Sequence, residues 1–500
     1  MPEEPVVVVG AGVAGLAAAV ELAARGRAVT VLERGSTPGG KLREVEIDGR
    51  RLDAGPTVLT LRGIFDDLFD VAGTRLEEHL SLTPVSVLAR HAWGPDAQLD
   101  LHADPERSRE AIGLFAGAAE ARRYTAFLTR SRHVYETLEA SFIRAPAPSV
   151  AHLVRHAGLR GLGALAAISP FRSLWSALGD HFHDPRLQQL FGRYATYLGS
   201  SPYEAPATLM LLAHVEQAGV WLVDGGMHRI AQVLAQLATG LGATIRYAAE
   251  VRTIEIERGA SRAAMLTSGE RVAASAVIVN ADASALGNGS LGAMAAAAAP
   301  AVPVAARSLS ALTWNIVAQT EGFALSRHTV FFSSDYRREF EDIFRRDSLP
   351  TEPTVYVCAQ DRDDLGRRSD TGPERLLCLV NAPPTGDRRP FTSAEIESCE
   401  QRTFTLLERS GLRIRRTPER TAVTTPADFN RLFPGSGGSL YGRASHGWRA
   451  SFQRPGVRTR IRGLYLAGGS IHPGPGVPMA ALSGRLAAGA LIADSASTRR

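Results

Sequence analysis

The N-terminal strand–turn–helix pattern constrains the fold of this 500-residue chain more than any other feature. Pro5–Val9 is a continuous apolar run, typical of a strand buried on both faces of a parallel sheet. It leads into G-A-G-V-A-G, where Gly10 permits a tight turn, Gly12 lets the backbone approach a pyrophosphate, and Gly15 lets a helix pack closely on the strand. We therefore expect a helix over residues 13–25.

The start of that helix and the end of the next strand complete a dinucleotide pattern. Val13 and Ala14 lie in the first turn, whose free N–H groups and positive dipole end favour phosphate. A second strand over residues 28–32 ends at Glu33, followed by Arg34, and a carboxylate there binds both hydroxyls of an adenosine ribose. Glycines also mark ordinary turns, but the placement of this acidic residue favours a dinucleotide and argues against NADP.

A second glycine loop, Gly39-Gly40-Lys41-Leu42, follows the second strand. It resembles the loop of amine-oxidase-type flavoproteins that runs beside the pyrophosphate and the flavin, which favours FAD over NAD. Lys41 is the only lysine of the chain, and a single positive charge is all that a phosphate contact requires. No further strand–GxGxxG–helix unit occurs, so we expect a quinone or oxygen to reoxidise the flavin.

Composition excludes several other classes of protein. Cys358, Cys378 and Cys399 are too widely spaced for a disulfide framework or a zinc site, so we expect no metal and a non-covalently held FAD. The dinucleotide pattern begins so early that it leaves no room for a signal peptide. No window holds about 18 uninterrupted apolar residues, so no membrane span is predicted. These features favour a cytoplasmic protein.

The chain is basic, with a net charge of +5 and a pI of about 9.3. Its arginines are scattered, and neither a recognition motif nor a basic stripe with interleaved aromatic residues accompanies them, so we exclude nucleic acid as a partner. An anionic membrane surface is the better match. The basic and apolar stretch Ser149–Phe182, which includes Trp175, is typical of an interfacial element and equally of two core helices.

The chain alternates between two kinds of structure. Residues 1–73, 216–290 and 440–500 carry the α/β patterns, and we expect them to form three parts of one cofactor-binding domain. Residues 74–215 are predicted to be mostly helical, with few strands. Residues 291–439 are predicted to form a substrate domain of strands and helices.

Four blocks spread over the chain carry a specific resemblance. They are the N-terminal fingerprint with G-G-K-L, D-A-G-P-T from Asp53, L-Y-G-R-A-S-H-G-W from Leu440 with F-Q-R-P from Phe452, and H-P-G-P-G-V-P from His472. With them the chain resembles the phytoene-desaturase type of bacterial carotenoid desaturases, within the FAD-dependent amine oxidase superfamily. Residues 51–69 and 88–105 are most similar to the hydroxyneurosporene (methoxyneurosporene) desaturases.

The resemblance implies an α/β fold in which a Rossmann-like FAD-binding domain is interleaved with a mixed sheet-and-helix substrate domain and a helical, membrane-facing part. A helix starting near Met479 would direct its positive end at the flavin and stabilise the anionic reduced form. Val251 would bind adenine through its backbone. In chain order, the implied FAD contacts are Gly10, Gly12, Val13, Ala14, Gly15, Glu33, Arg34, Gly40, Lys41, Leu42, Gly55, Pro56, Thr57, Val58, Val251, Gly468, Gly469, Val477, Pro478 and Met479.

The implied reaction transfers hydride from an allylic carbon of a carotenoid to flavin N5, with loss of a proton from the neighbouring carbon. A conjugated polyene delocalises the developing positive charge, so the protein supplies mainly alignment and a proton acceptor. His472 is the first candidate for that acceptor, and His446 and His91 are others, although histidine also caps and packs. A water-insoluble substrate further implies peripheral association with the inner membrane.

The resemblance favours 3,4-desaturation of a 1-hydroxy- or 1-methoxy-carotenoid such as 1-hydroxyneurosporene. Apolar tunnel walls discriminate poorly between chains that differ by one hydroxyl, and the sequence does not identify the hydrogen-bonding group that such a choice needs. Three alternatives stay open. One is a phytoene desaturase, another a flavin oxidase of amines or protoporphyrinogen, which would lack H-P-G-P-G-V-P. The third is a non-catalytic prenyl- or lipid-binding protein of the same fold, which would have no use for the intact fingerprint.

Overall fold

The computed structural model describes residues 4–149, 171–368 and 370–498. Its first sheet has the strand order β10–β2–β1–β14–β21, paired in parallel throughout. The strands are β1 (Val6–Val9), β2 (Val29–Leu32), β10 (Thr244–Arg246), β14 (Ala276–Val279) and β21 (Leu464–Leu466). Because they come from the beginning, the middle and the end of the chain, the predicted interleaved, Rossmann-like fold is confirmed.

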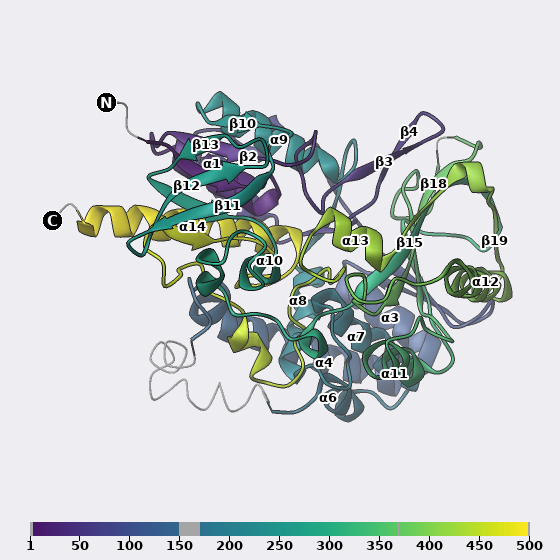
Figure 1. Cartoon of the computed structure of the whole chain (residues 1–500). Coiled ribbons are helices and arrows are strands. Elements are labelled where there is room, and N and C mark those ends of the chain that lie inside the picture. The colour runs from purple at the N-terminus through teal and green to yellow at the C-terminus, as the bar shows by residue number, and fades with distance from the viewer. Residues whose placement is uncertain (1–3, 150–170, 369, 499–500) are drawn as a thin grey trace.

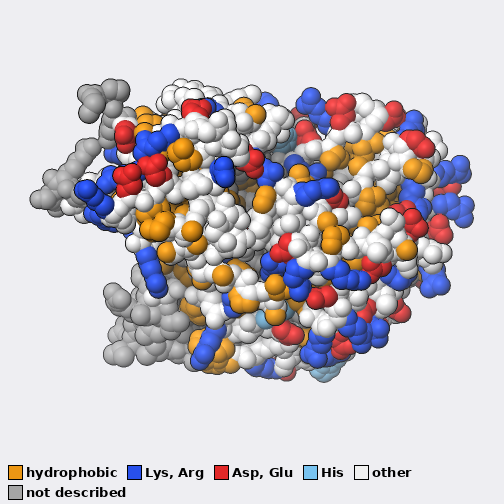
Figure 2. Space-filling model, viewed as in Figure 1, with side chains coloured by type: hydrophobic (Ala, Val, Ile, Leu, Met, Phe, Trp, Pro, Cys, Tyr) orange, Lys and Arg blue, Asp and Glu red, His pale blue; other side chains and the backbone are white. Residues whose placement is uncertain are grey.

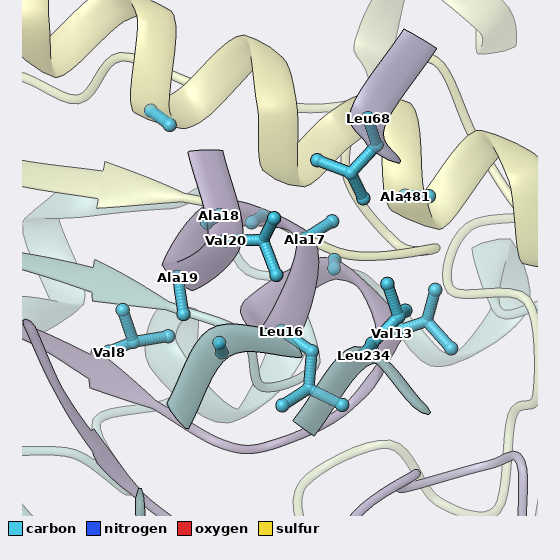
Figure 3. Close-up of a cluster of buried hydrophobic side chains, with 14 of the residues drawn as sticks. Val8, Val13, Leu16, Ala17, Ala18, Ala19, Val20, Leu68, Leu234 and Ala481 are labelled. Atoms are coloured by element: carbon cyan, nitrogen blue, oxygen red, sulfur yellow. The ribbon is translucent and has the colours of Figure 1, made fainter. Parts of the chain in front are cut away.

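Helix α1 (Val13–Ala23) is buried along its whole length. Its sequence, V-A-G-L-A-A-A-V-E-L-A, carries small side chains on every face, which lets neighbouring helices approach closely. Those neighbours are α2 (Gly63–Val71), α9 (His228–Gly240) and α14 (Val477–Thr498). Figure 3 shows one side chain from each of them around α1: Leu68, Leu234 and Ala481.

Helix α14 is the one helix in the described part of the chain that is long and apolar enough to cross a membrane. Its apolar window, Val477–Ser497, is 56% buried inside the fold. A Cβ atom at Gly484 would lie only 2.0 Å from the backbone oxygen of Ala14, so α14 lies directly on α1. This contact identifies α14 as a core helix that brings the end of the chain to its beginning.

The second large sheet is mixed, with the strand order β19–β15–β18–β17–β16–β7–β8 and β20 paired to β15. Residues 74–215 are predicted to hold few strands, yet β7 and β8 of this mixed sheet come from them. Strand β7 pairs in parallel with β16, which lies far along the chain, and β8 pairs with β7. The strands are β7 (Val87–Ala92), β8 (Gln98–His102), β15 (Ser310–Gly322), β16 (His328–Phe331), β17 (Val355–Ala359), β18 (Glu374–Ala382), β19 (Leu412–Arg415) and β20 (Thr421–Thr424).

Three small antiparallel sheets accompany the two large ones. The hairpin of β3 and β4 reaches from the parallel sheet toward the mixed sheet (Figure 1), where Leu52 packs with Val317 of β15. The strands are β3 (Glu44–Ile47) and β4 (Arg50–Asp53), then β5 (Leu59–Thr60), β6 (Leu82–Pro84) and β9 (Val220–Val223), and finally β11 (Val251–Glu257), β12 (Ala260–Leu266) and β13 (Arg271–Ala273).

The remaining helices surround the mixed sheet, except for α10 (Ala283–Gly287), which follows β14. In Figure 1 most of them lie to the lower right, with α8 and α13 near the centre, whereas the parallel sheet and both chain ends lie to the left. The stacked rings of Phe182 and Phe191, with centroids 4.9 Å apart, fill the core between the first helices of this group. The group comprises α3 (Pro105–Ala116), α4 (Ala118–Leu138), α6 (Leu174–His181), α7 (Pro185–Gly192), α8 (Leu211–Gln217), α11 (Tyr336–Arg346), α12 (Ser393–Arg409) and α13 (Pro426–Leu432).

Charged side chains of both signs are interspersed on the surface. Figure 2 shows Lys and Arg beside Asp and Glu over the right-hand lobe, rather than one continuous basic field on this face. The left-hand lobe also pairs charges of opposite sign, such as Arg246 with Glu270 (2.6 Å) and Arg271 with Glu255 (2.7 Å). A nucleic-acid interface requires a concentrated basic surface, which the face in Figure 2 does not present.

Candidate functional site

The glycines of the N-terminal motif surround one side chain, that of Asn280. A Cβ atom at Gly10 would lie 2.8 Å from the backbone oxygen of Asn280, and one at Gly12 would lie 2.8 Å from its Oδ1. The Oδ1 atom accepts a hydrogen bond from Gly15 N (2.9 Å), while Nδ2 donates to Ala467 O (3.3 Å). Asn280 thus joins the start of α1 to the C-terminal segment. Sequence reasoning missed it, although the polar N-A-D directly after β14 was the available signal.

The first turn of α1 lies at the carboxyl edge of the parallel sheet. Its N-cap is Gly12, which has no side chain to satisfy the free N–H groups of that turn. The loop predicted to run beside the pyrophosphate lies against it, since Gly39 N donates to Ala11 O (2.8 Å) and a Cβ atom at Gly40 would lie 3.4 Å from the Cα atom of Gly12. The result is a narrow backbone cradle with donors on one side, which fits a pyrophosphate.

Glu33 lies at the end of β2 and is buried. Its carboxylate accepts hydrogen bonds from Ala11 N and Gly35 N, both at 2.7 Å, which fix its orientation. The backbone of Glu33 also accepts a hydrogen bond from Ala249 N (2.8 Å), and this bond brings Val251 at the start of β11 to the same end of the site. The structure therefore gathers the predicted ribose and adenine residues from two distant parts of the chain.

Asp53 fixes the D-A-G-P-T segment against helix α9. Its carboxylate accepts hydrogen bonds from Met227 N (2.8 Å) and His228 N (3.1 Å) at the start of that helix. Burial raises the pKa of Asp53, and the two N–H donors oppose this shift. A Cβ atom at Gly55 would lie 1.9 Å from the backbone oxygen of Lys41, so the two predicted flavin-proximal segments, residues 40–42 and 55–58, are in direct contact.

A partly buried lysine and a buried arginine fix the C-terminal blocks in place. Lys41 Nζ donates to Leu440 O at 2.6 Å, and burial lowers the pKa of its ammonium group. Arg454 donates to Tyr441 O (2.9 Å), Arg443 O (2.7 Å) and Gly469 O (3.3 Å), and burial lowers its pKa to about 10. The sequence resemblance contained Arg454 but gave it no role; here it holds the third block against the fourth.

The C-terminal segment returns to the carboxyl edge of the parallel sheet. After β21, Ala467 N donates to Val279 O (2.9 Å) and Gly468 N to Ser483 Oγ (3.2 Å) of α14. Helix α14 begins at Val477, followed by Pro478 and Met479, as predicted. Its positive end therefore lies at the same edge as that of α1.

The three candidate histidines occupy different environments. His472 is buried, and its Nε2 lies 2.8 Å from Phe142 O, so this nitrogen carries the proton; Nδ1 has no hydrogen-bond partner within the described residues. Burial lowers the pKa of His472 to about 4. His446 pairs with Glu204 at 3.0 Å. His91 is buried and stacks on Phe332, and burial lowers its pKa to about 3. Of the three, His472 alone belongs to the predicted flavin-proximal segment.

The described residues contain no group of three or more His, Cys, Asp or Glu side chains arranged to hold a metal ion. The cysteines Cys358, Cys378 and Cys399 are buried in β17, β18 and α12, and Cys378 and Cys399 belong to the apolar core of the mixed sheet. The donor set of the site, with its backbone cradle, its ribose carboxylate and its two helix N-termini, instead fits a flavin dinucleotide.

The fold and the site together define a flavoprotein oxidoreductase of the interleaved, two-lobed kind. Residues 13–492 match the family of flavin containing amine oxidoreductases. The chain belongs to this family, and its cofactor is FAD.

Two relatives are similar to this chain over nearly its whole length. The hydroxyneurosporene desaturase of Rubrivivax gelatinosus is 54% identical over 99% of this chain and 94% of its own. That of Cereibacter sphaeroides is 44% identical over 99% of both chains. Among solved structures, a putrescine oxidase has a TM-score of 0.60 and 16% identity, covering 98% of this chain and 99% of its own. The solved structure is similar in fold alone.

We expect the substitution Glu33→Gln to weaken FAD binding about tenfold, because an amide lacks the charge that strengthens hydrogen bonds to the ribose hydroxyls. Fluorescence titration of the apoprotein with FAD measures the dissociation constant. Glu46→Gln, on the exposed edge of the β3–β4 hairpin, is the matched control and should bind FAD as the wild type does. Equal affinity of the two variants would contradict the assignment of Glu33.

Glutamine at position 472 tests the role of the histidine, because its amide keeps a donor for Phe142 O but has no basic nitrogen. We expect His472→Gln to retain FAD and most of the turnover, since a nitrogen with a pKa of about 4 is a poor acceptor for a carbon-bound proton. The imidazole stays neutral above that pH, so it should add no step to the rate profile between pH 5 and 8. A loss of about 100-fold in kcat would instead establish His472 as the proton acceptor.

Proposed function

We propose that this protein is an FAD-dependent desaturase of acyclic carotenoids, and that it introduces the 3,4 double bond of a 1-hydroxy- or 1-methoxy-carotenoid. The observation that carries the proposal is its 54% identity, along 99% of the chain, to a hydroxyneurosporene desaturase. Relatives that oxidise other carotenoids are more distant: the 4,4'-diapolycopene oxygenase of Methylomonas sp is 30% identical.

The surface beside the predicted flavin position supports an apolar substrate. Val58 of the D-A-G-P-T segment and Phe452 of the F-Q-R-P block both pack against the hydrophobic cluster of the helical part. That cluster is rich in Leu and Phe and includes Trp93 at its margin. Such walls match a long polyene, whereas a cationic amine would lose its hydration there without gaining a partner.

The residues of the site would align substrate and cofactor and exclude water from between them. Bound FAD supplies the acceptor for the hydride removed from the allylic carbon. The N-terminus of α14, at Val477, would stabilise negative charge on the reduced cofactor through its dipole. The proton acceptor is unassigned: His472 lies in the flavin-proximal segment, but its lowered pKa makes it a poor acceptor. Because the sequence holds one dinucleotide motif, a quinone or oxygen would reoxidise the enzyme.

We also propose peripheral membrane binding from the cytoplasmic side. Residues 150–170, most of the predicted interfacial element, lie outside the described residues. Directly after them, Phe171 is 75% exposed and its ring meets that of Trp448, with centroids 5.3 Å apart. Arg449 lies over Trp448 at 5.1 Å. Exposed aromatic rings beside an arginine are typical of a membrane interface.

Turnover of separate substrates tests the proposed reaction. The FAD-loaded protein in liposomes, in air or anaerobically with a quinone, should desaturate 1-hydroxyneurosporene faster than neurosporene and leave phytoene unchanged. Product from phytoene, and none from the hydroxylated substrate, would move the assignment to a phytoene desaturase. Reduced enzyme that neither oxygen nor quinone reoxidises would contradict the proposed electron acceptors.

Removal of both aromatic rings tests the membrane contact. We expect Phe171→Ser with Trp448→Ser to lower the fraction that floats with anionic liposomes, with about tenfold weaker partitioning, because two large apolar side chains leave the interface. Leu114→Ser, which changes another exposed apolar residue on α3, is the matched control and should float as the wild type does. Unchanged flotation of the double variant would exclude this surface.

A further inference from the structure

A chain of three polar side chains crosses from the cofactor lobe into the mixed sheet. Thr57 Oγ1 of the D-A-G-P-T segment lies 2.7 Å from the hydroxyl of Tyr356 in β17. That hydroxyl lies 2.7 Å from Nδ1 of His328 in the neighbouring strand β16. The rings of His328 and Tyr356 stack, with an interplanar angle of 15°. The roles given above to the N-terminal motif and to the candidate proton acceptors leave this hydrogen-bonded chain without a function.

The two ends of this hydrogen-bonded chain of side chains differ in exposure. His328 is 3% exposed, and its Nε2 has no hydrogen-bond partner among the residues that the structure describes. Burial lowers the pKa of His328 to about 3, so the ring is neutral. At the other end Thr57 and its neighbour Val58 are only partly buried. Of the two ends, Thr57 is therefore the one open to a ligand.

The direction of the hydrogen bonds follows from the neutral imidazole. If Nε2 carried the ring proton, a buried N–H donor would lack an acceptor, which proteins avoid more strictly than a bare lone pair. With the proton on Nδ1, His328 donates to Tyr356, and Tyr356 donates to Thr57. The proton of the Thr57 hydroxyl is then free to point outward. Thr57 is the end of this hydrogen-bonded chain that can donate a hydrogen bond to a ligand.

The position of Thr57 matches the position of the substituent that distinguishes the proposed substrates. Val58, next to it, packs on the apolar cluster that would face the polyene. In a 1-hydroxy- or 1-methoxy-carotenoid the oxygen is two carbons away from the 3,4 bond. Whatever binds that oxygen must therefore lie beside the bond that loses hydrogen, which is where the D-A-G-P-T segment is predicted to meet the flavin.

We propose that the Thr57 hydroxyl, oriented by Tyr356 and His328, binds the C1 oxygen of the substrate and so selects hydroxylated or methoxylated carotenoids. This proposal rests on the proposed function. A methoxy oxygen only accepts hydrogen bonds, so a site that admits both substituents must donate, as Thr57 does. An unsubstituted carotenoid would bury the same hydroxyl without a partner, which is unfavourable. Tyr356 and His328 are positioning residues.

The test measures kcat/KM for 1-hydroxyneurosporene and for neurosporene with the FAD-loaded protein in liposomes, and their dissociation constants from the shift of the carotenoid absorption band. Thr57→Val should lower the ratio of the two kcat/KM values, and the preference in binding, about tenfold. Thr57→Ser, which restores the hydroxyl, should restore the preference. Tyr356→Phe should lower it less. Tyr336→Phe is the matched control, a buried tyrosine of α11 outside the apolar cluster, and should keep the wild-type ratio.

Flavin content, measured by absorbance, separates this role from cofactor binding. A Thr57→Val variant that loses activity on both substrates equally, or keeps the wild-type ratio, would overturn the proposal. Failure of Thr57→Ser to restore the preference would overturn it as well. If the wild type desaturates neither compound, the proposed function fails, and the dissociation constants still decide whether Thr57 recognises the oxygen.

Discussion

The interaction on which the cofactor site depends is the pair of hydrogen bonds made by the Asn280 side chain. One joins it to Gly15 at the start of α1 and the other to Ala467 before the C-terminal segment. The amide oxygen occupies the space that side chains at Gly12 and Gly15 would need, and the backbone oxygen of Asn280 does the same at Gly10. The glycines of the fingerprint are therefore required for two reasons: they leave room for a phosphate on one side and for Asn280 on the other. Loss of this amide would remove the side-chain link between the two ends of the chain at the point where the cofactor needs both.

A second set of contacts ties the flavin-proximal segment to the substrate lobe. Gln360 accepts a hydrogen bond from Asp53 N and donates to Asp53 O, both at 2.9 Å, and Asn315 donates to the same oxygen at 3.0 Å. The carboxylate of Asp53 meanwhile holds the start of α9. Since one residue is held by both lobes, the D-A-G-P-T segment cannot shift with either lobe alone. That rigidity is what alignment of a hydride donor with a flavin requires.

The local patterns of the sequence were enough for much of the fold. The apolar run before Gly10, the Ala-rich helix after it and the acid at Glu33 follow from short-range rules, and the structure has β1, α1 and β2 where these rules place them. The strands β7 and β8 were not foreseen, because β7 is stabilised by pairing with β16, which lies far along the chain. Asn280 was missed for the same reason: its partners Gly15 and Ala467 are distant in sequence and close only in space. Arg454 was missed although its partners lie only 11 to 15 residues away, because they are backbone oxygens, which carry no sequence signal.

The sequence by itself determined the class of cofactor, because a phosphate cradle and a ribose carboxylate are built from neighbouring residues whose spacing is visible in one dimension. It also carried the resemblance to carotenoid desaturases. Only the tertiary structure decided how the four blocks meet, which histidines are buried, and that Thr57 is linked to Tyr356 and His328. The physical reason is that burial and hydrogen-bond partnership depend on the closure of the two lobes. No local pattern of residues encodes which side chains that closure brings together.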